Sequence, residues 1–215
     1  MEKHTVLMTL TDPGVVAIIR SDGPEGLLEA ALALYRGGAR AVEISLTTPG
    51  ALGAIESIRK QLPEACLIGA GTVLDPETVR LAILAGTQFI VAPISKVDLI
   101  QACLRYGVPV FSGAYTPTEA FAAYEAGADF IKIFPADKLG PAYIRALLAP
   151  MPQLALVPTG GVTPENCGPY FQAGCVAVAV GSSVVNSKLI AEQAWDTITA
   201  KVQAYVVATR AAKQK

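Results

Sequence analysis

The chain has 215 residues, of which 52% are hydrophobic and 16% charged, so most of it must be buried in one substantial core. Its formal net charge is −1 and it has no long basic tract, which excludes a typical nucleic-acid-binding protein. The sequence shows no membrane-spanning run, no secretory signal and no CxxC spacing among its four cysteines. We therefore expect a cytoplasmic protein with no membrane partner, zinc site or disulfide framework.

Residues 2–12 predict a short N-terminal helix that ends at Asp12-Pro13-Gly14, and they include the only histidine, His4. A single histidine cannot build a multi-histidine metal site, and this one lies before the first strand signal, away from any triad. Acid–base chemistry must then use carboxylates, lysine, tyrosine, cysteine or water. We expect no metal and no organic cofactor.

Apolar runs typical of strands then recur at even spacing, and each is followed by a segment with helical periodicity. The predicted strands cover residues 15–20, 41–46, 66–69, 89–92, 109–112, 129–136, 154–158 and 176–180. The predicted helices cover residues 25–35, segments after 49 and after 76, residues 95–106, 116–126 and 141–148, a segment from 164, and one long C-terminal helix to about 208. Eight such units predict a single (β/α)8 TIM-barrel domain over residues 1–215. A doubly wound open sheet is the main alternative.

Alternation along the strands places ionisable side chains inside this barrel. Helix-facing positions must be apolar, so polar residues that alternate with them point inward. By this rule Glu43 faces inward between Val42 and Ile44, and Arg20 faces inward after the outward Ile19. Both lie near the C-terminal ends of their strands, where such barrels keep their active sites.

Lys132 lies in the middle of an apolar run, on the same face as Phe130 and Phe134. For an isolated lysine, a side chain that reaches solvent or pairs with a carboxylate is the usual structural explanation. Because Lys132 is expected to converge with Glu43 and Arg20, a catalytic role is favoured instead. A desolvated amine is partly neutral and attacks a ketone to form a Schiff base, with Glu43 as the proton shuttle. The structural alternative for Glu43 is a salt bridge with Arg20 or Lys132.

Two glycine-containing loops follow the last two predicted strands, Thr159-Gly160-Gly161-Val162 and Gly181-Ser182-Ser183. Glycines let backbone N–H groups approach an anion, and hydroxyls add donors. Phosphate sites of these barrels recur at this position, so the two loops predict a phosphate site, although Gly-Gly alone also makes tight turns. The loop Gly69-Ala70-Gly71-Thr72 is either a third anion contact or a strained connection.

Six motifs, taken in order, resemble the family of 2-keto-3-deoxy-6-phosphogluconate and 4-hydroxy-2-oxoglutarate aldolases. The resemblance covers the chain from about Val15 to Val185. The motifs are Val42-Glu43-Ile44-Ser45-Leu46, Ile68-Gly69-Ala70-Gly71-Thr72-Val73, Thr116-Pro117-Thr118-Glu119, Lys132-Ile133-Phe134-Pro135-Ala136, Pro158-Thr159-Gly160-Gly161-Val162 and Val180-Gly181-Ser182-Ser183.

The resemblance implies a class I lyase of the Entner–Doudoroff pathway that releases pyruvate and glyceraldehyde 3-phosphate. It implies that Lys132 forms the Schiff base and that Glu43 is the general acid/base. Thr72 would hold the pyruvate carboxylate, and Pro93 and Phe134 would line the pocket. The two glycine-containing loops would hold the phosphate. Members are commonly homotrimers, so the resemblance also implies a second and third copy of the chain as partners.

Two positions depart from the family pattern. Some members carry an arginine where this chain has Thr47, and we expect Arg20 to supply that charge near the carboxylate. The loop after the fifth strand usually reads Pro-Gly and here is Ser112-Gly113. We expect Ser112 to face inward and to hydrogen-bond the substrate hydroxyls. Both departures bear on substrate preference more than on the reaction type.

The leading hypothesis is cleavage of 2-keto-3-deoxy-6-phosphogluconate through an imine on Lys132. The alternatives with the same chemistry are 2-keto-3-deoxy-6-phosphogalactonate, 4-hydroxy-2-oxoglutarate and decarboxylation of oxaloacetate, because an imine at C2 stabilises the same enamine. A non-covalent sugar-phosphate isomerase or epimerase is less favoured, since its metal-dependent forms need histidine ligands. A non-enzymatic sugar-phosphate-binding protein would require Lys132 and Glu43 to be a mere ion pair.

Overall fold

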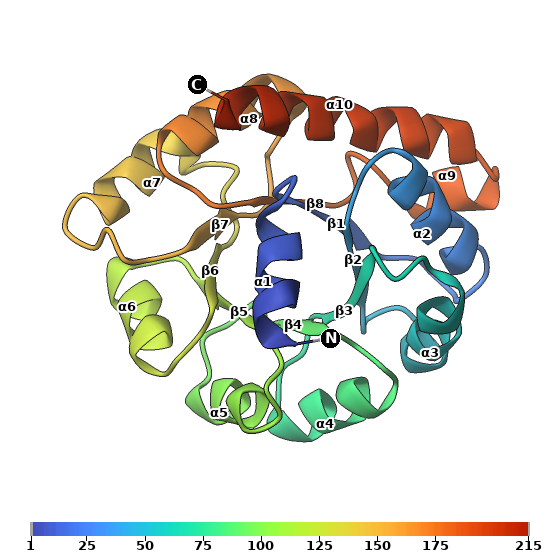
Figure 1. The fold of residues 1–215 in the computed structure, drawn as a ribbon, viewed down its shortest axis with the longest axis horizontal. Coiled ribbons are helices and arrows are strands. Elements are labelled where there is room, and N and C mark those ends of the chain that lie inside the picture. The colour runs from blue at the N-terminus through green and yellow to red at the C-terminus, as the bar shows by residue number, and fades with distance from the viewer. Residues whose placement is uncertain (1, 215) are drawn as a thin grey trace.

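The computed structural model describes residues 2–214 and arranges eight strands in a ring that is surrounded by helices (Figure 1). The strands are β1 Val15–Ile19, β2 Ala41–Ser45, β3 Leu67–Gly71, β4 Phe89–Val91, β5 Val110–Ala114, β6 Phe130–Ile133, β7 Leu156–Pro158 and β8 Val178–Val180. The helices are α1 Lys3–Thr11, α2 Leu27–Arg36, α3 Ala51–Gln61, α4 Pro76–Leu84, α5 Val97–Arg105, α6 Pro117–Glu125, α7 Gly140–Leu148, α8 Pro164–Gln172, α9 Ser187–Ala191 and α10 Trp195–Lys213.

The strands form one parallel sheet in the order β7-β6-β5-β4-β3-β2-β1-β8. An isolated parallel bridge between Thr159 and Ala179 joins the two ends of this series, so the barrel is nearly closed. The register sets Glu43 beside Ile18 of β1 and Gly69 of β3. This arrangement confirms the predicted (β/α)8 barrel and excludes the open doubly wound sheet.

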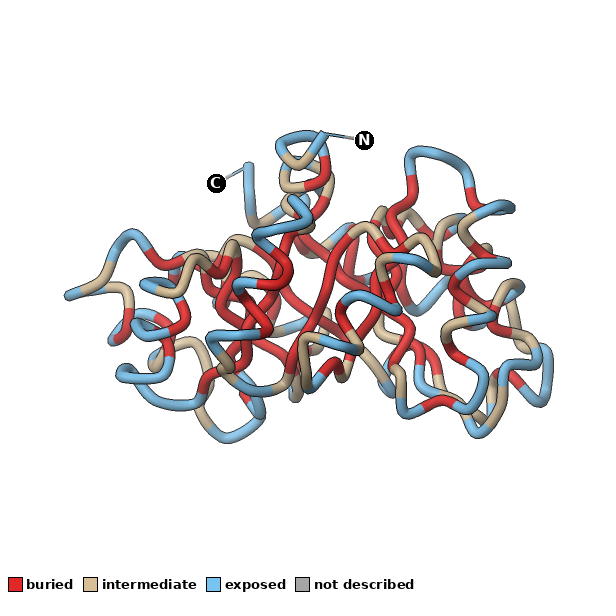
Figure 2. The backbone as a smooth tube through the Cα atoms, turned by 90° about the horizontal axis from the view of Figure 1, so that it is seen from below, coloured by how far each residue is buried: buried red, intermediate tan, exposed pale blue. Residues whose placement is uncertain are grey.

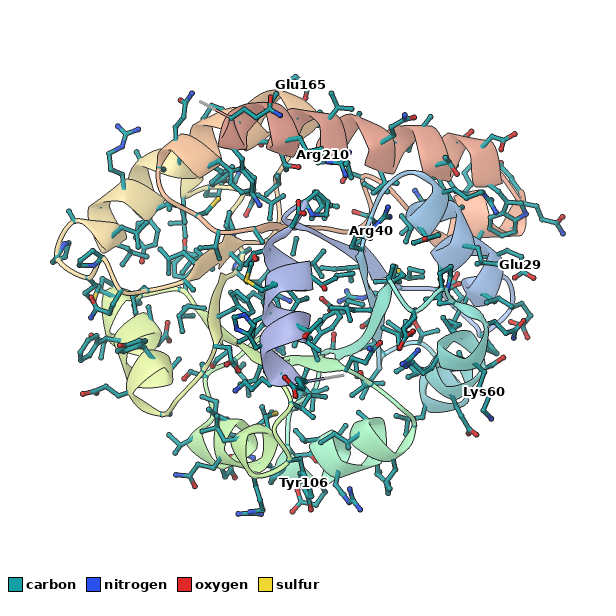
Figure 3. All side chains as sticks on the ribbon, in the orientation of Figure 1. Glu29, Arg40, Lys60, Tyr106, Glu165 and Arg210 are labelled. Carbon is teal, nitrogen blue, oxygen red and sulfur yellow. The ribbon has the colours of Figure 1, made fainter. Side chains whose placement is uncertain are left out.

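Strand side chains divide into two cores, as the alternation predicts. The outward core packs the strands against the helices and includes Val42, Ile44, Ile131 and Ile133. Figure 2 shows the buried residues concentrated on the strands and on the inner faces of the helices. The labelled polar side chains Glu29, Lys60, Tyr106 and Glu165 in Figure 3 mark the periphery of the helix ring.

The inward core fills the barrel with aromatic rings. Phe89, Phe111 and Phe130 form a stack, with ring centroids 5.8 Å apart for the first pair and 4.5 Å for the second. Val6 and Leu10 of α1 belong to the same cluster, and α1 lies across the N-terminal end of the barrel (Figure 1). That end is therefore covered, and only the C-terminal end of the strands remains for a site.

Side-chain caps fix the starts of four helices at this C-terminal end of the barrel. Each cap accepts a hydrogen bond from a backbone N–H of the first helical turn, which satisfies a group that the helix itself leaves unpaired. The four caps are Asp75 of α4, Thr116 of α6, Thr163 of α8 and Asn186 of α9. The loops that carry candidate site residues are thus anchored on their helix side.

The expected single C-terminal helix is in fact two helices, α9 and α10. They are separated at residues 192–194, where Gln193 adopts a φ of 50° in the left-handed region. That conformation ends α9, and neither glycine nor proline marks the break in the sequence. Among residues 2–214, none of the helices combines the length and the apolar character that crossing a membrane requires.

Candidate active site

Lys132 lies on β6 inside the barrel and is only 6% exposed. Its neighbours Ile131 and Ile133 pack outward against the helices, which turns the lysine inward. Its Nζ lies 5.0 Å from the centre of the Phe134 ring, within the range of a cation–π contact. The amine is therefore a buried group at the C-terminal end of the barrel, as the alternation predicts.

Glu43 lies on β2 inside the barrel and is 2% exposed. Burial raises the pKa of Glu43, and the charges of Lys132 and Arg20 oppose that rise. The two cations are thus close enough to act on the carboxyl group electrostatically. No ion pair within 4.0 Å joins Lys132 to Glu43 among the salt bridges of residues 2–214. The lysine and the glutamate are therefore near enough to interact electrostatically but do not form an ion pair.

Gly71 makes the space that the Glu43 side chain occupies. A Cβ at this position would lie 1.8 Å from Oε1 of Glu43, so no side chain fits there while Glu43 keeps its position. Gly69 does the same for the ring of Phe89, which would lie 2.3 Å from an added Cβ. The glycines of β3 therefore serve close packing inside the barrel, an explanation that neither sequence interpretation of this loop included.

The glycine-containing loops after β7 and β8 line one cavity of about 490 Å³. Gly160 and Gly161 have φ values of 94° and 69°, which L side chains rarely adopt. The N-cap residue of α8, Thr163, also lines the cavity, and the positive end of the helix dipole at this point favours an anion. The structure thus brings all of the predicted phosphate residues to one place: Thr159, Gly160, Gly161, Gly181, Ser182 and Ser183.

Arg20 and Phe134 connect this cavity to the lysine. Both line the cavity together with the two loops. Phe134 also carries the ring that faces Lys132 Nζ, and Arg20 acts on the pKa of Glu43. Arg20 itself is exposed at the mouth. A cation at this point attracts an anionic ligand toward the buried amine.

Three hydroxyl groups are linked near the ends of β2 and β3. Ser45 Oγ lies 2.8 Å from Thr47 Oγ1 and 2.9 Å from Thr72 Oγ1. Thr72 has a φ of 59°, a strained conformation for a β-branched residue. Thr47 lines a separate hollow beside α3 and does not line the cavity of the two loops. Ser45 is buried, faces inward and was missed by sequence reasoning; its position two residues after Glu43, on the same face of the strand, was the available signal.

The inward orientation expected for Ser112 is wrong. Val110 and Ala114, two positions either side, belong to the outward core, so Ser112 points toward the helices. Its hydroxyl is fully buried and has no hydrogen-bond partner. Gly113 is the inward residue here, and an added Cβ would lie 2.2 Å from the backbone of Pro93. Pro93, half-buried, therefore packs against the glycine.

Two asparagines that sequence reasoning missed hold the loop backbones. Asn166 donates from Nδ2 to the carbonyl of Gly161 at 2.9 Å while completing the capping box of α8. Asn186 donates to the carbonyl of Ser182 at 3.3 Å. The sequence signal for the first is Thr163-Pro164-Glu165-Asn166, a helix start in which the third residue after the cap can reach back.

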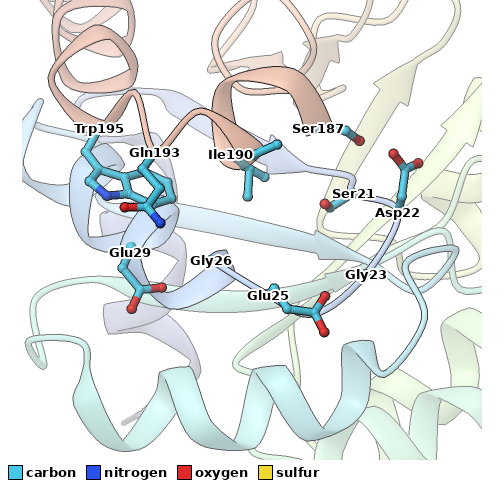
Figure 4. Close-up of a pocket in the computed structure, with 11 residues that line it drawn as sticks. Ser21, Asp22, Gly23, Glu25, Gly26, Glu29, Ser187, Ile190, Gln193 and Trp195 are labelled. Atoms are coloured by element: carbon cyan, nitrogen blue, oxygen red, sulfur yellow. The ribbon is translucent and has the colours of Figure 1, made fainter.

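A second cavity of about 590 Å³ adjoins the first between the β1–α2 loop and the α9–α10 junction (Figure 4). The acidic residues Asp22, Glu25 and Glu29 line it together with Trp195, and none of its lining residues is basic. None of the predicted site residues lines it either. Its negative charge makes it unsuited to a phosphorylated acid.

Comparison with known proteins gives a consistent result. Residues 6–201 match the sequence model of the family described as KDPG and KHG aldolase. A 2-dehydro-3-deoxy-6-phosphogalactonate aldolase of Escherichia coli is 40% identical over 192 residues, which are 89% of this chain and 94% of the relative.

Solved structures agree in fold. A structure described as native KDPGal matches with a TM-score of 0.87 and 39% identity, over 94% of this chain and 96% of that one. A KDPG aldolase of Legionella pneumophila, with pyruvate captured as a covalent carbinolamine intermediate, matches with a TM-score of 0.83 and 28% identity. That match covers 93% of this chain and 97% of the Legionella chain.

Proposed function

The chain belongs to the KDPG and KHG aldolase family and is a carbon–carbon lyase, and we propose that it forms its Schiff base on Lys132. The proposed substrate is a 2-keto-3-deoxy-6-phospho sugar acid, cleaved to pyruvate and glyceraldehyde 3-phosphate. The gluconate-derived substrate expected from the sequence and its galactonate epimer are both candidates, since the 40% identical relative is named for the galactonate compound.

In the proposed reaction the neutral amine of Lys132 attacks C2 of the substrate to form a carbinolamine. Glu43 supplies the proton with which the hydroxyl leaves as water, giving a cationic imine. Glu43 then accepts the proton of the C4 hydroxyl, directly or through a water, as the C3–C4 bond breaks. The bonding electrons pass into the imine and form an enamine. Protonation of the enamine at C3 and hydrolysis of the imine return pyruvate and the amine.

One observation carries this proposal: Lys132 and Glu43 are both buried inside the barrel and converge without pairing. An ion pair would have supported the binding-protein alternative, because it would tie up both groups. The raised pKa of Glu43 also suits a group that must both give and take a proton.

The same geometry supports a proposal for substrate binding. We propose that the two glycine-containing loops bind the phosphate and that the dipole of α8 favours its negative charge. Arg20, at the mouth of the same cavity, is placed to attract the anionic substrate. Thr72, held by Ser45, is the proposed donor to the carboxylate of the keto acid, and Pro93 and Phe134 the proposed pocket walls.

Borohydride reduction with pyruvate tests the chemistry. Wild-type protein should gain one reduced pyruvyl group, and peptide mapping should place it on Lys132. A Lys132→Met variant should gain none, while Ser112→Ala, which alters an outward-facing hydroxyl, should be labelled like the wild type. Absence of the adduct in folded wild-type protein would remove the covalent mechanism.

Substrate choice is tested by pyruvate release from the two epimeric phosphates, their unphosphorylated analogues and 4-hydroxy-2-oxoglutarate, and by carbon dioxide release from oxaloacetate. We expect either phosphorylated epimer to exceed every unphosphorylated compound in kcat/KM. Equal values with and without phosphate would contradict the assignment of the loops.

We also propose a homotrimer located in the cytoplasm. An apolar strip supports the trimer, since its exposed residues lie on α4, α5, α6 and the adjoining loops, which are neighbours in the ring (Figure 1). They are Leu81, Leu84, Ile94, Val97, Leu104, Tyr106, Tyr115, Phe121 and Tyr124. Light scattering should give three times the 22.4 kDa chain mass, and a monomer mass would refute this.

The proposed cytoplasmic location is supported by the four unpaired cysteines, which suit a reducing compartment. Cell fractionation tests this location.

A further inference from the structure

Tyr205 of α10 reaches between the two glycine-containing loops. Its hydroxyl lies 2.9 Å from the carbonyl oxygen of Val162, in the loop after β7. It also lies 3.0 Å from Oγ of Ser183, in the loop after β8. Tyr205 is 3% exposed and lies well beyond the last of the motifs on which the family resemblance rests. One buried hydroxyl thus touches both halves of the proposed phosphate site without lining the cavity itself.

The number of available protons determines which group donates in each of the two hydrogen bonds. A phenol carries one proton, and a carbonyl oxygen can only accept. Tyr205 therefore donates to Val162, and the Ser183 hydroxyl donates to the phenolic oxygen. This arrangement occupies the only proton of Ser183, so its side chain is not free to donate to a phosphate. The side-chain donor in that loop is then Ser182.

Other contacts hold α10 against the same loop. Lys201, one turn before Tyr205, donates to the carbonyl of Ser183 at 3.1 Å. Thr199 fixes α10 to α2 by donating to the carbonyl of Ala33 at 3.0 Å. The helix that carries Tyr205 is thus fixed to the barrel independently, and it can hold the loops in a set position.

We propose that Tyr205 is a positioning residue that sets the spacing of the two phosphate-binding loops by bonding to both. This inference rests on the proposed function, because it takes the loops as the phosphate site. Tyr205 acts through Val162 and Ser183 and touches no substrate atom. Its loss should weaken recognition of the phosphate and leave the chemistry at Lys132 intact.

The test is Tyr205→Phe, which keeps the ring and removes the hydroxyl. We expect KM for the phosphorylated substrate to rise about fivefold, the size expected when a hydrogen bond of ordinary strength is lost. The inhibition constant of inorganic phosphate should rise by a similar factor. Turnover number, activity on the unphosphorylated analogue and deuterium exchange into the methyl group of pyruvate should remain at wild-type values. The matched control is Tyr170→Phe, which removes another buried hydroxyl, bonded at 3.4 Å to the carbonyl of Ala136. Its KM should stay at the wild-type value.

Ser183→Ala gives a second measurement, should the tyrosine variant fold poorly. Alone it should raise KM for the phosphorylated substrate, because it removes the hydrogen bond to Tyr205. Combined with Tyr205→Phe it should raise KM no further, since that hydrogen bond is already missing. Additive effects would mean that Ser183 donates to the phosphate directly and would overturn the inference. So would a Tyr205→Phe variant with unchanged KM, or one that loses affinity for both classes of substrate equally. Failure of the proposed function is distinguishable, because wild-type protein itself would then show no preference for the phosphate.

Discussion

Replacing Gly71 with alanine should disable the candidate site by displacing Glu43. The added Cβ would lie 1.8 Å from Oε1, 2.4 Å from Cδ and 2.6 Å from Cγ of Glu43. Carbon atoms in contact are about 3.5–4.0 Å apart, so the carboxyl group must move by more than about 1 Å. The backbone of Gly71 is not in the left-handed region, so the effect is purely steric.

A displacement of about 1 Å costs a reacting group on the order of 10²-fold in rate. We therefore expect kcat/KM of Gly71→Ala to fall about 100-fold, with a loss of about 1–3 kcal/mol in the free energy of unfolding from overpacking. Pyruvate release coupled to lactate dehydrogenase measures the first quantity, and urea denaturation the second.

Gly53→Ala on α3 is the matched control, because beyond its chain neighbours and the backbone of its own helix no atom lies within 4 Å of the added Cβ. It should keep the wild-type kcat/KM and gain about 0.5–1 kcal/mol, as expected for alanine in place of glycine inside a helix. A folded Gly71→Ala protein with wild-type kcat/KM would refute the reasoning. It would mean that the carboxyl group of Glu43 need not occupy its observed position.

Three further predictions concern stability. Because burial raises the pKa of Glu43 above its ordinary 4.5, the folded state holds that proton to higher pH than the unfolded state, and stability falls as pH rises through that interval. Glu43→Gln removes this loss of stability. The urea midpoint of the variant should therefore exceed that of the wild type, and the excess should be larger at pH 8 than at pH 4. An equal excess at both pH values would contradict the raised pKa. Phe111→Ala, which empties the centre of the aromatic stack, should cost about 3–5 kcal/mol, measured by denaturation; Phe111→Leu should cost clearly less. Thr116→Ala removes the cap of α6 and should cost about 1 kcal/mol, and an unchanged melting temperature would show that the capping box is dispensable.

The alternation of polar and apolar residues predicted which side chains face the barrel interior only in strands whose two faces differ clearly in polarity. In β2 and β6 a single charged residue sits between β-branched neighbours, so Glu43 and Lys132 could be assigned an inward orientation. In β5 the sequence Val-Phe-Ser-Gly-Ala puts one small polar residue among apolar ones, and all five positions are buried. Nothing in that pattern separates the two faces, and the orientation of Ser112 was predicted wrongly.

Other features depend on contacts between distant segments, which no local pattern encodes. The break between α9 and α10 lies at Gln193, a residue type that gives no signal for a helix end. The hydroxyl of Tyr205 joins residues 43 and 22 positions away along the chain, in two different loops. Such pairings follow from how α10 packs against α8 and α2 on the outside of the barrel and become visible only in three dimensions.

Helix α1 and the phenylalanine stack close the N-terminal end of the barrel. Ligands can therefore enter and leave only at the C-terminal end of the strands. In the proposed reaction the three-carbon fragment sits at the closed end, while the phosphorylated fragment lies toward the exit. The two products must then leave in a fixed order. The aldehyde leaves first, and the water that hydrolyses the imine enters by the same path. Pyruvate, the last product out, should behave as a competitive inhibitor, and the aldehyde phosphate as a noncompetitive one.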